Sequence, residues 1–396
     1  MNLKKIVLAA CTLLIFFTSC EQNDVFPTDK YTCMLAVGDS SLTHPKANIY
    51  QNILERHRKN GLVGATLLVK DGDGLWMGAD GMADIASDIN VKPCNSFLIA
   101  SISKVFTSAA VYRYVDQGVI TLEDPISKWL APEIVDKVEN AQEAQIKHLL
   151  THTSGIADFY TLQFELDRLN KISNNFTKEE VLEYTYGIAA THETGETYAY
   201  SNTNFLLLAM ILERASGLTF EQVYEQEVFS PLGLVSAYYS EENPIPEGCV
   251  KGYYDIYGNG QYAESEFLYG DELGIGGDGG IAINAYDLAL FLEGLSKGEL
   301  ISETSLVQMN DWFDLPTDWH WEAFGQTENG FGIEKFNTQY GYAVGHSGGI
   351  DGFSSLALYF PETDMTYILL VNSAGNEEGF ESQEEIFREV MMEISE

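Results

Sequence analysis

The chain has 396 residues, 45% of them hydrophobic, and its 22 basic residues are outnumbered by 59 acidic ones, which gives a net charge of −37. A surface this acidic repels phosphate and argues against nucleic acid as a partner. The length allows two domains, or one large domain with an insertion, and the apolar content allows a sizeable core.

The first 45 residues predict targeting and tethering. Lys4 and Lys5 precede an apolar run over residues 6–17, and small residues then lead to Cys20. This pattern predicts a signal peptide over residues 1–19, because the apolar run is too short to span a membrane. Cys20 resembles the lipidation site of bacterial lipoproteins, whereas ordinary secretion would leave it incidental. With residues 20–45 as a tether, we expect a lipid-anchored protein of the bacterial cell envelope, in the periplasm or outer membrane.

Cysteine and histidine spacing predicts no metal site. Cys33, Cys94 and Cys249 remain after the predicted cleavage and lipidation, and they are too scattered for a disulfide framework. One bridge among them is compatible with an oxidising compartment, with its pairing open. His148 and His152 are four residues apart and could bind a metal on one helix face, but no third ligand is evident. A structural role is therefore favoured for both.

The rest of the chain predicts strands near both ends and helices between them. Residues 61–70 and 75–82, joined by the turn Asp71-Gly72-Asp73-Gly74, predict an antiparallel hairpin. Strands around a helical middle indicate one α/β core with a mostly helical insertion. The other expected elements are helices at 49–57, 178–186, 204–216, 220–228, 285–295 and 384–394, and strands at 342–345, 353–360 and 365–371.

Ser101 and Lys104 open a stretch whose apolar spacing predicts a helix that ends near Gly118. Residues three apart on a helix share a face, so the two side chains can meet. A serine hydroxyl needs a neighbouring base or cation to act as a nucleophile. A half-buried lysine can supply either, because its pKa falls on desolvation. The alternative is a serine that caps the helix, followed by a solvated lysine.

A second polar cluster, Tyr200-Ser201-Asn202, directly precedes a predicted helix. Tyr200 can act as a general base if a cation lowers its pKa, and Asn202 can donate a hydrogen bond to a substrate carbonyl. The alternative is a turn in which Asn202 caps the helix and Tyr200 packs in the core.

Two glycine-rich segments follow. His346-Ser347-Gly348-Gly349 lies between predicted strands, where glycines allow a ligand to approach and backbone N–H groups suit an oxyanion hole. His346 could supply a hydrogen bond or a positive charge, and the alternative is a glycine-rich hairpin with a surface histidine. The segment Gly276-Gly277-Asp278-Gly279-Gly280 lacks the lysine of a phosphate-binding loop and is expected to line the wall of a cleft.

Ser-x-x-Lys, Tyr-x-Asn and His-x-Gly occur here in an order that resembles the penicillin-recognising serine hydrolases. This family includes class C β-lactamases, D-alanyl-D-alanine carboxypeptidases, D-aminopeptidases and related esterases. The resemblance extends beyond the three motifs and runs from about residue 45 to the C-terminus. The segments that carry it are 97–104, 146–155, 195–202, 231–234, 276–287 and 345–354.

The resemblance implies an α/β (α+β) fold in which an antiparallel sheet is flanked by helices and carries an inserted, mostly helical domain. The β-lactamase-related domain would span residues 46–396. Its α/β lobe would contain residues 46–120 and 275–396, and its helical lobe residues 121–274. The active site would lie between the two lobes.

The resemblance also implies residue roles. Ser101 would be the acylated nucleophile and Lys104 would hold the proton network that activates it. Tyr200 would serve as general base in acylation and as acid toward the leaving group. Whether Lys104 or Tyr200 is the true base stays open, because the two groups can titrate together.

The other implied roles surround this centre. Asn202 would position the substrate and Lys104, and the N–H groups of Ser101 and Gly349 would form the oxyanion hole. Ser347 and Gly348 would bind substrate. His346 would face a substrate carboxylate or assist Tyr200.

His346 stands where many relatives carry a lysine, and a histidine offers only a pH-dependent charge. This difference favours a serine hydrolase that forms an acyl-enzyme on D-amino-acid peptides, amides or esters. The alternatives are a β-lactamase proper and a non-catalytic binding lipoprotein of the same fold. The resemblance implies a small-molecule or peptide substrate and no metal or organic cofactor.

Overall fold

The structure is a computed structural model that describes residues 43–170, 176–241, 246, 248–265, 275–320, 324–373 and 377–395. The predicted signal peptide, most of the predicted tether, Cys20 and Cys33 lie outside these residues. Within the described part of the chain, no helix combines the length and the apolar character needed to cross a membrane.

Nine strands form one antiparallel sheet in the order β3-β2-β1-β13-β12-β11-β10-β9-β8. Ala65 of β1 lies opposite Val371 of β13, so the N-terminal hairpin joins the C-terminal strands within a single sheet. The strands are β1 (Gly64–Asp71), β2 (Gly74–Asp84), β3 (Ile89–Asn90), β8 (Phe313–Asp314), β9 (Gln326–Asn329), β10 (Glu334–Thr338), β11 (Gly341–Ile350), β12 (Phe353–Phe360) and β13 (Met365–Val371).

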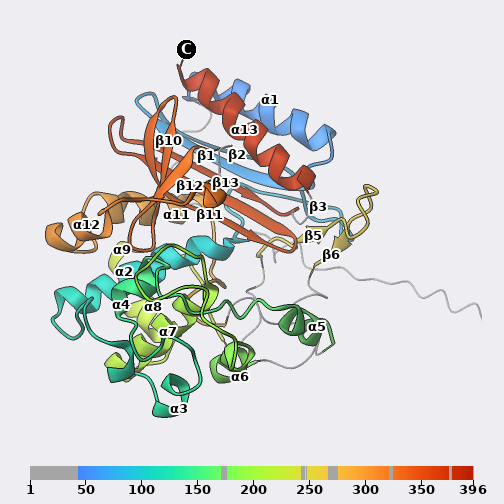
Figure 1. Cartoon of the computed structure of the whole chain (residues 1–396). Helices are drawn as coiled ribbons and strands as arrows, with labels where there is room; N and C mark the ends of the chain where they lie inside the picture. The colour runs from blue at the N-terminus through green and yellow to red at the C-terminus, as the bar shows by residue number, and fades with distance from the viewer. Residues whose placement is uncertain are drawn as a thin grey trace, which may run out of the picture.

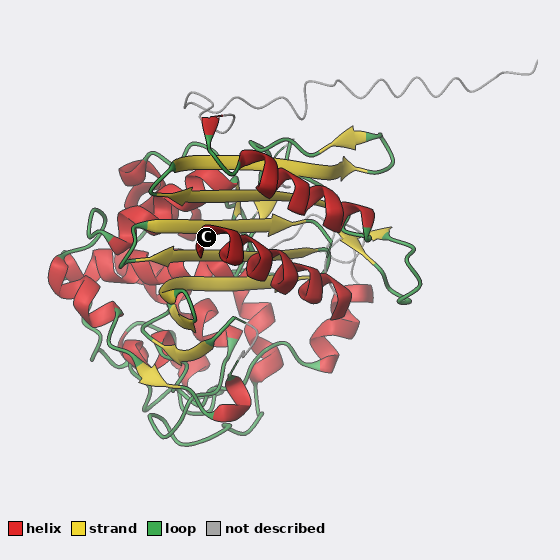
Figure 2. Ribbon diagram, turned by 90° about the horizontal axis from the view of Figure 1, so that it is seen from above, coloured by secondary structure: helices red, strands yellow, loops and turns green. Residues whose placement is uncertain are grey.

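Helices cover both faces of this sheet. Helices α1 (Ala47–Lys59) and α13 (Glu377–Ser395) lie side by side on one face (Figures 1 and 2). Helices α2 (Ser103–Asp116) and α11 (Ala285–Ser296) lie on the other, where the rings of Phe106 and Phe291 stack with centroids 3.5 Å apart. Because both faces are covered, every residue of β13 is buried, which explains why its sequence is almost entirely apolar.

The middle of the chain forms a mostly helical part beneath the sheet (Figure 1). Two short strand pairs lie outside the nine-stranded sheet, β4 (Phe97–Leu98) with β7 (Ala282–Ile283) and β5 (Tyr253–Tyr254) with β6 (Ala263–Glu264). The remaining helices are α3 (Pro132–Val135), α4 (Ile146–Leu150), α5 (Leu162–Asn170), α6 (Lys178–Leu182), α7 (Asn202–Ser216), α8 (Phe220–Tyr224), α9 (Ser230–Leu232) and α12 (Glu303–Met309).

The antiparallel hairpin is confirmed as β1 and β2, and the strands at 353–360 and 365–371 are confirmed as β12 and β13. The helix expected to open at Ser101 instead begins at Ser103, after a 3₁₀ turn over Ala100–Ile102. The helix expected at 220–228 begins as α8 and continues as a π-helical turn over Glu225–Phe229. β9 and β10 were not predicted, because their sequences are largely polar and they become strands by pairing with each other and with β11.

Strand β11 passes close to the turn before Ser101, and Gly348 makes this approach possible. A Cβ atom at Gly348 would lie 2.2 Å from the carbonyl oxygen of Ile99. The hydroxyl of Ser355 on β12 donates to the same oxygen at 3.0 Å, which fixes the turn against the sheet. The sheet therefore positions the segment that carries the candidate nucleophile.

We expect Gly348→Ala to lower the free energy of unfolding by about 1–3 kcal/mol, the usual cost of overpacking a well-packed site. Turnover should fall as well, because β11 or the turn before Ser101 must move. Denaturant unfolding measures the first effect. Gly72→Ala in the β1–β2 turn is the matched control, because nothing lies within 4 Å of a Cβ atom there. Equal stability of the two variants would show that the approach at Gly348 is not tight.

Candidate active site

Ser101 sits in a strained turn between β4 and α2. The preceding residue, Ala100, has a φ of +47°, which a residue with a Cβ atom rarely adopts. Such strain persists only where the surroundings enforce it, and it concentrates at functional sites. The amide of Ile99 donates to the carbonyl of Ile281 at 3.1 Å and holds the turn in place.

Lys104 is fully buried one turn further along. Its Nζ lies 3.1 Å from Ser101 Oγ, 2.7 Å from Asn202 Oδ1 and 2.7 Å from the carbonyl oxygen of Asp278. Burial lowers the pKa of Lys104 to about 8, although the carboxylates of Asp278 and Asp158 oppose this shift. The two carbonyl-type oxygens can accept both hydrogens of a neutral amine, which leaves its lone pair toward Ser101.

Tyr200 lies beside this pair. A hydrogen bond joins it to Ser101, but burial dominates and raises the pKa of Tyr200 well above its usual value. The ring of His152 stacks on the Tyr200 ring with centroids 4.3 Å apart, and His152 Nδ1 accepts a hydrogen bond from the Ser201 amide at 3.1 Å. His152 thus holds the Tyr200 segment in place. Burial also lowers the pKa of His152, so its ring is neutral at neutral pH.

Asn202 is the first residue of α7, and its amide is oriented by two partners. Its Oδ1 faces Lys104, and its Nδ2 donates to Asp158 Oδ2 at 2.9 Å. Because a carboxylate accepts and the N–H groups of Lys104 donate, these partners fix which way the amide points. Burial raises the pKa of Asp158.

The β11 side of the site carries no fixed positive charge among its described residues. His346 Nδ1 lies 3.6 Å from Glu334 Oε2, and the Ser347 amide donates to the same carboxyl oxygen at 3.1 Å. Burial raises the pKa of Glu334 to about 8 and lowers the pKa of His346 to about 3. Both groups are therefore mainly uncharged at neutral pH, so His346 does not act as the cation that a substrate carboxylate would need.

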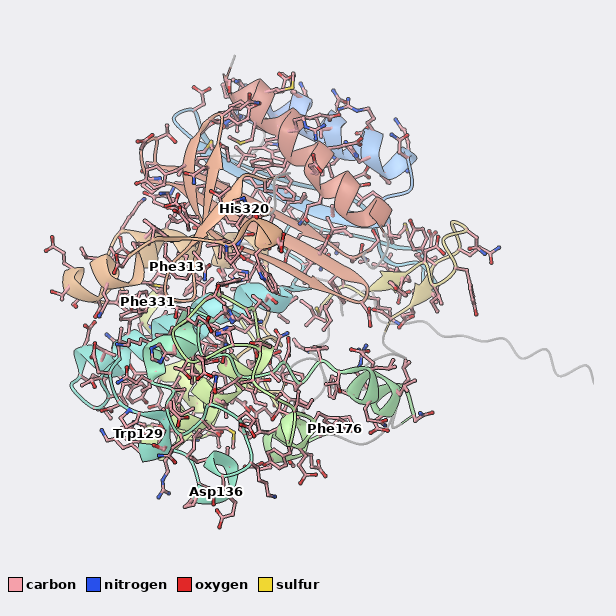
Figure 3. All side chains as sticks on the ribbon, viewed as in Figure 1. Trp129, Asp136, Phe176, Phe313, His320 and Phe331 are labelled. Carbon is pink, nitrogen blue, oxygen red and sulfur yellow. The ribbon has the colours of Figure 1, made fainter. Side chains whose placement is uncertain are left out.

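Two cavities of about 480 and 470 Å³ meet at Ser101, Tyr200 and Gly349. The first has several aromatic lining residues, among them Phe176. Figure 3 labels Phe176 in the helical part, near α6. The second is lined by the polar residues of β10 and β11. The other residues of the first cavity are Ala100, Phe159, Tyr160, Phe164, Glu165, Arg168, Asn202, Ile275, Asp278, Gly279, Ile350 and Asp351. Those of the second are Glu334, His346, Ser347 and Gly348.

The structure thus brings together the residues that the sequence singled out. Hydrogen bonds join Ser101, Lys104, Tyr200 and Asn202 into one cluster, Gly349 lines both cavities, and His346 lines the second. Asp278 and Gly279 of the glycine-rich segment line a cavity wall, as expected.

His148 and His152 do not share a helix face. His148 lies on α4, whereas His152 lies beyond the end of that helix with a φ of +54°. No group of three potential metal ligands occurs among the residues that the structure describes. Cys94 is disulfide-bonded, and Cys249 is a buried free thiol.

The sequence did not indicate four residues as part of the site. They are His152, which stacks on Tyr200, Asp158, which binds Asn202, and the acids Asp278 and Glu334. His152 belongs to the segment 146–155, whose resemblance to the family was a usable signal. Glu334 lies in a polar strand that no pattern marked. Asp278 was treated only as part of a glycine loop.

A nucleophilic serine bonded to a buried lysine, at the mouth of two cavities between a sheet and a helical part, defines a serine hydrolase. The chain matches the Beta-lactamase family over residues 49–390 and belongs to it. As a member of this family, it works through an acyl-enzyme.

Similar proteins agree with this assignment. Penicillin-binding protein 4* of Bacillus subtilis is 28% identical over 342 residues, which cover 82% of this chain and 70% of that protein. The D-stereospecific amidohydrolase of a Streptomyces species superposes with a TM-score of 0.72 at 24% identity, over 82% of this chain and 94% of its own. The D-amino acid amidase of Ochrobactrum anthropi, solved with L-phenylalanine amide, superposes with a TM-score of 0.74 at 22% identity. The match covers 87% of this chain and 97% of the amidase. The two solved structures share the fold with this chain.

Proposed function

We propose that this enzyme hydrolyses peptides, amides or esters of D-amino acids through an acyl-enzyme on Ser101. One observation carries the assignment of the nucleophile: Ser101 Oγ lies 3.1 Å from the Nζ of a fully buried lysine. The substrate class is supported by the D-amino acid amidase and D-stereospecific amidohydrolase among the structural neighbours. It is also supported by the β11 side of the site, where the described lining residues include no fixed cation for a substrate carboxylate.

In the proposed acylation step, Ser101 Oγ attacks the substrate carbonyl and gives its proton to the neutral amine of Lys104. The N–H groups of Ser101 and Gly349 stabilise the oxyanion that forms. The leaving amine or alcohol takes a proton from the Tyr200 phenol as its bond to carbon breaks, and Lys104 returns a proton to Tyr200. In deacylation, a water molecule attacks the ester carbon and gives a proton to the neutral amine of Lys104. The bond between that carbon and Ser101 Oγ then breaks, Lys104 passes the proton to Oγ, and the acid product leaves.

The pKa directions favour Lys104 over Tyr200 as the base. Burial lowers the pKa of Lys104 to about 8, so a useful fraction of the amine is neutral near neutral pH. Burial raises the pKa of Tyr200 well above its usual value, so the phenol keeps its proton. A protonated phenol that is bonded to Ser101 and lines the second cavity suits the role of proton donor to the leaving group.

A substrate panel tests this proposal. We expect amides and esters of D-amino acids to be hydrolysed with a kcat/KM at least about tenfold above their L enantiomers, a difference of about 1.4 kcal/mol. A chromogenic cephalosporin, which carries a carboxylate, should be a poorer substrate, because His346 is uncharged. Faster hydrolysis of the cephalosporin would favour a β-lactamase. A folded protein with no turnover and no labelling by fluorescent penicillin or fluorophosphonate would favour a binding protein.

A further inference from the structure

Asp278 differs from the other acids of the first cavity. The residue is only 7% exposed, and its Oδ1 has no hydrogen-bond partner among the described residues. By contrast, Glu165 and Asp351 each bind Arg168, at 2.6 and 2.9 Å, and Asp158 binds Asn202 at 2.9 Å. A buried carboxyl oxygen without a hydrogen-bond partner is costly, so this position favours a ligand that satisfies it.

The main chain of Asp278 already serves the catalytic centre, because its carbonyl oxygen accepts a hydrogen bond from Lys104 Nζ at 2.7 Å. Any residue could provide that carbonyl, so the interaction does not explain the carboxyl side chain. The backbone is tightly fixed here: a Cβ atom at Gly277 would lie 2.6 Å from Thr107 Oγ1. Asp278 is therefore held in the wall of the first cavity, which Ser101, Tyr200 and Asn202 also line.

The charge around this cavity favours a cation. Three acids line it, Glu165, Asp278 and Asp351, and the one positively charged side chain among its described lining residues, Arg168, is bound to Glu165 and Asp351 and not to Asp278. The aromatic wall formed by Phe159, Tyr160 and Phe164 offers an apolar surface next to this charge. A ligand that carries an ammonium and a large apolar group would satisfy both features.

The second cavity has a different chemistry. Glu334 and His346 line it together with Tyr200, and all three can carry protons. A leaving amine or alcohol must gain a proton, so this side suits the leaving group. The acyl part of the substrate would then occupy the first cavity, next to Asp278.

We propose that Asp278 binds the α-ammonium group of the substrate's acyl residue, so that the enzyme prefers D-amino-acid derivatives with a free amino group and a large apolar side chain. The proposal rests on the proposed function, because it assumes that a D-amino acyl group is transferred to Ser101. It predicts cleavage after an unblocked N-terminal residue rather than removal of a C-terminal one.

Two p-nitrophenyl esters with the same leaving group test the proposal: that of D-phenylalanine and that of 3-phenylpropanoic acid, which lacks only the amine. In the wild-type protein we expect kcat/KM to be at least about tenfold higher for the amine-bearing ester. Asp278→Asn should abolish this preference by raising KM. The readout is the ratio of kcat/KM between the two esters, which should fall to about one in Asp278→Asn, whatever the variant does to the catalytic step that both esters share.

Asp136→Asn is the matched control, since Asp136 is exposed at the end of α3 on the helical part (Figure 3) and should leave both esters unaffected. An equal fold loss of kcat/KM for both esters in Asp278→Asn would overturn the proposal, because the carboxyl would then act on Lys104. Equal wild-type activity on both esters would also overturn it. Hydrolysis of neither ester by the wild-type protein would instead contradict the proposed function.

A second measurement does not depend on the folding of a variant. D-Phenylalaninol and 3-phenylpropan-1-ol differ by one amino group and can be compared as competitive inhibitors of the wild-type protein. We expect the amine to bind at least about tenfold more tightly, as a charge-assisted contact in a buried site should provide. Equal inhibition by the two compounds would count against an ammonium site.

Discussion

Ser101→Ala is expected to reduce turnover by more than about 10³-fold, because the variant lacks the atom that forms the acyl bond. The effect should fall on kcat and kcat/KM together, since the substrate loses its covalent partner and not its binding surface. Fluorophosphonate labelling should disappear in the same variant. Steady-state hydrolysis of a D-amino-acid ester and gel fluorescence of the labelled protein measure the two effects.

Ser108→Ala is a matched control on α2. Ser108 is buried, and its Oγ has no hydrogen-bond partner among the described residues, so removal of this hydroxyl should change turnover little. Comparable activity of Ser101→Ala and Ser108→Ala would rule out Ser101 as the nucleophile.

Lys104→Ala and Tyr200→Phe are each expected to lower turnover by at least about 100-fold, the usual scale for loss of general acid–base catalysis. Lys104→Ala removes the amine that accepts the Ser101 proton. Tyr200→Phe removes one hydroxyl and leaves the ring on which His152 stacks. The two losses should not add, because both residues act on one proton network.

The pH dependence of kcat/KM tests whether Lys104 or Tyr200 is the base. Lysine is active in its neutral form, so kcat/KM for a substrate without ionisable groups should rise as the pH passes through about 8, the lowered pKa of Lys104. Lys59→Ala on α1 and Tyr257→Phe, both at exposed positions, are the controls and should keep the wild-type profile. A rate that is independent of pH across this range would argue against a titrating lysine base.

The sequence predicted the site residues better than it predicted their surroundings. Ser101, Lys104, Tyr200 and Asn202 are recognisable because short motifs fix their spacing within single segments. The apolar strands β12 and β13 are recognisable because burial on both faces leaves a continuous apolar run. In such segments, local sequence and tertiary structure agree.

The features that escaped prediction depend on contacts between distant segments. His152 reaches Tyr200 because the backbone of His152 adopts a left-handed conformation just after α4. Glu334 is buried because β10 pairs with β11, although its own sequence is polar. The low pKa of His346 follows from burial, which no motif reports. The signal peptide and the lipid anchor at Cys20 stay predictions.

The most direct test of the account is to locate the acyl group on the protein. The wild-type enzyme would be mixed with a slowly deacylating D-amino-acid ester, quenched in acid, and measured by intact-protein and peptide mass spectrometry. The account predicts one added acyl group per chain, on the peptide that contains Ser101, and none in Ser101→Ala. Turnover without any such adduct, or an adduct on a residue other than Ser101, would contradict it.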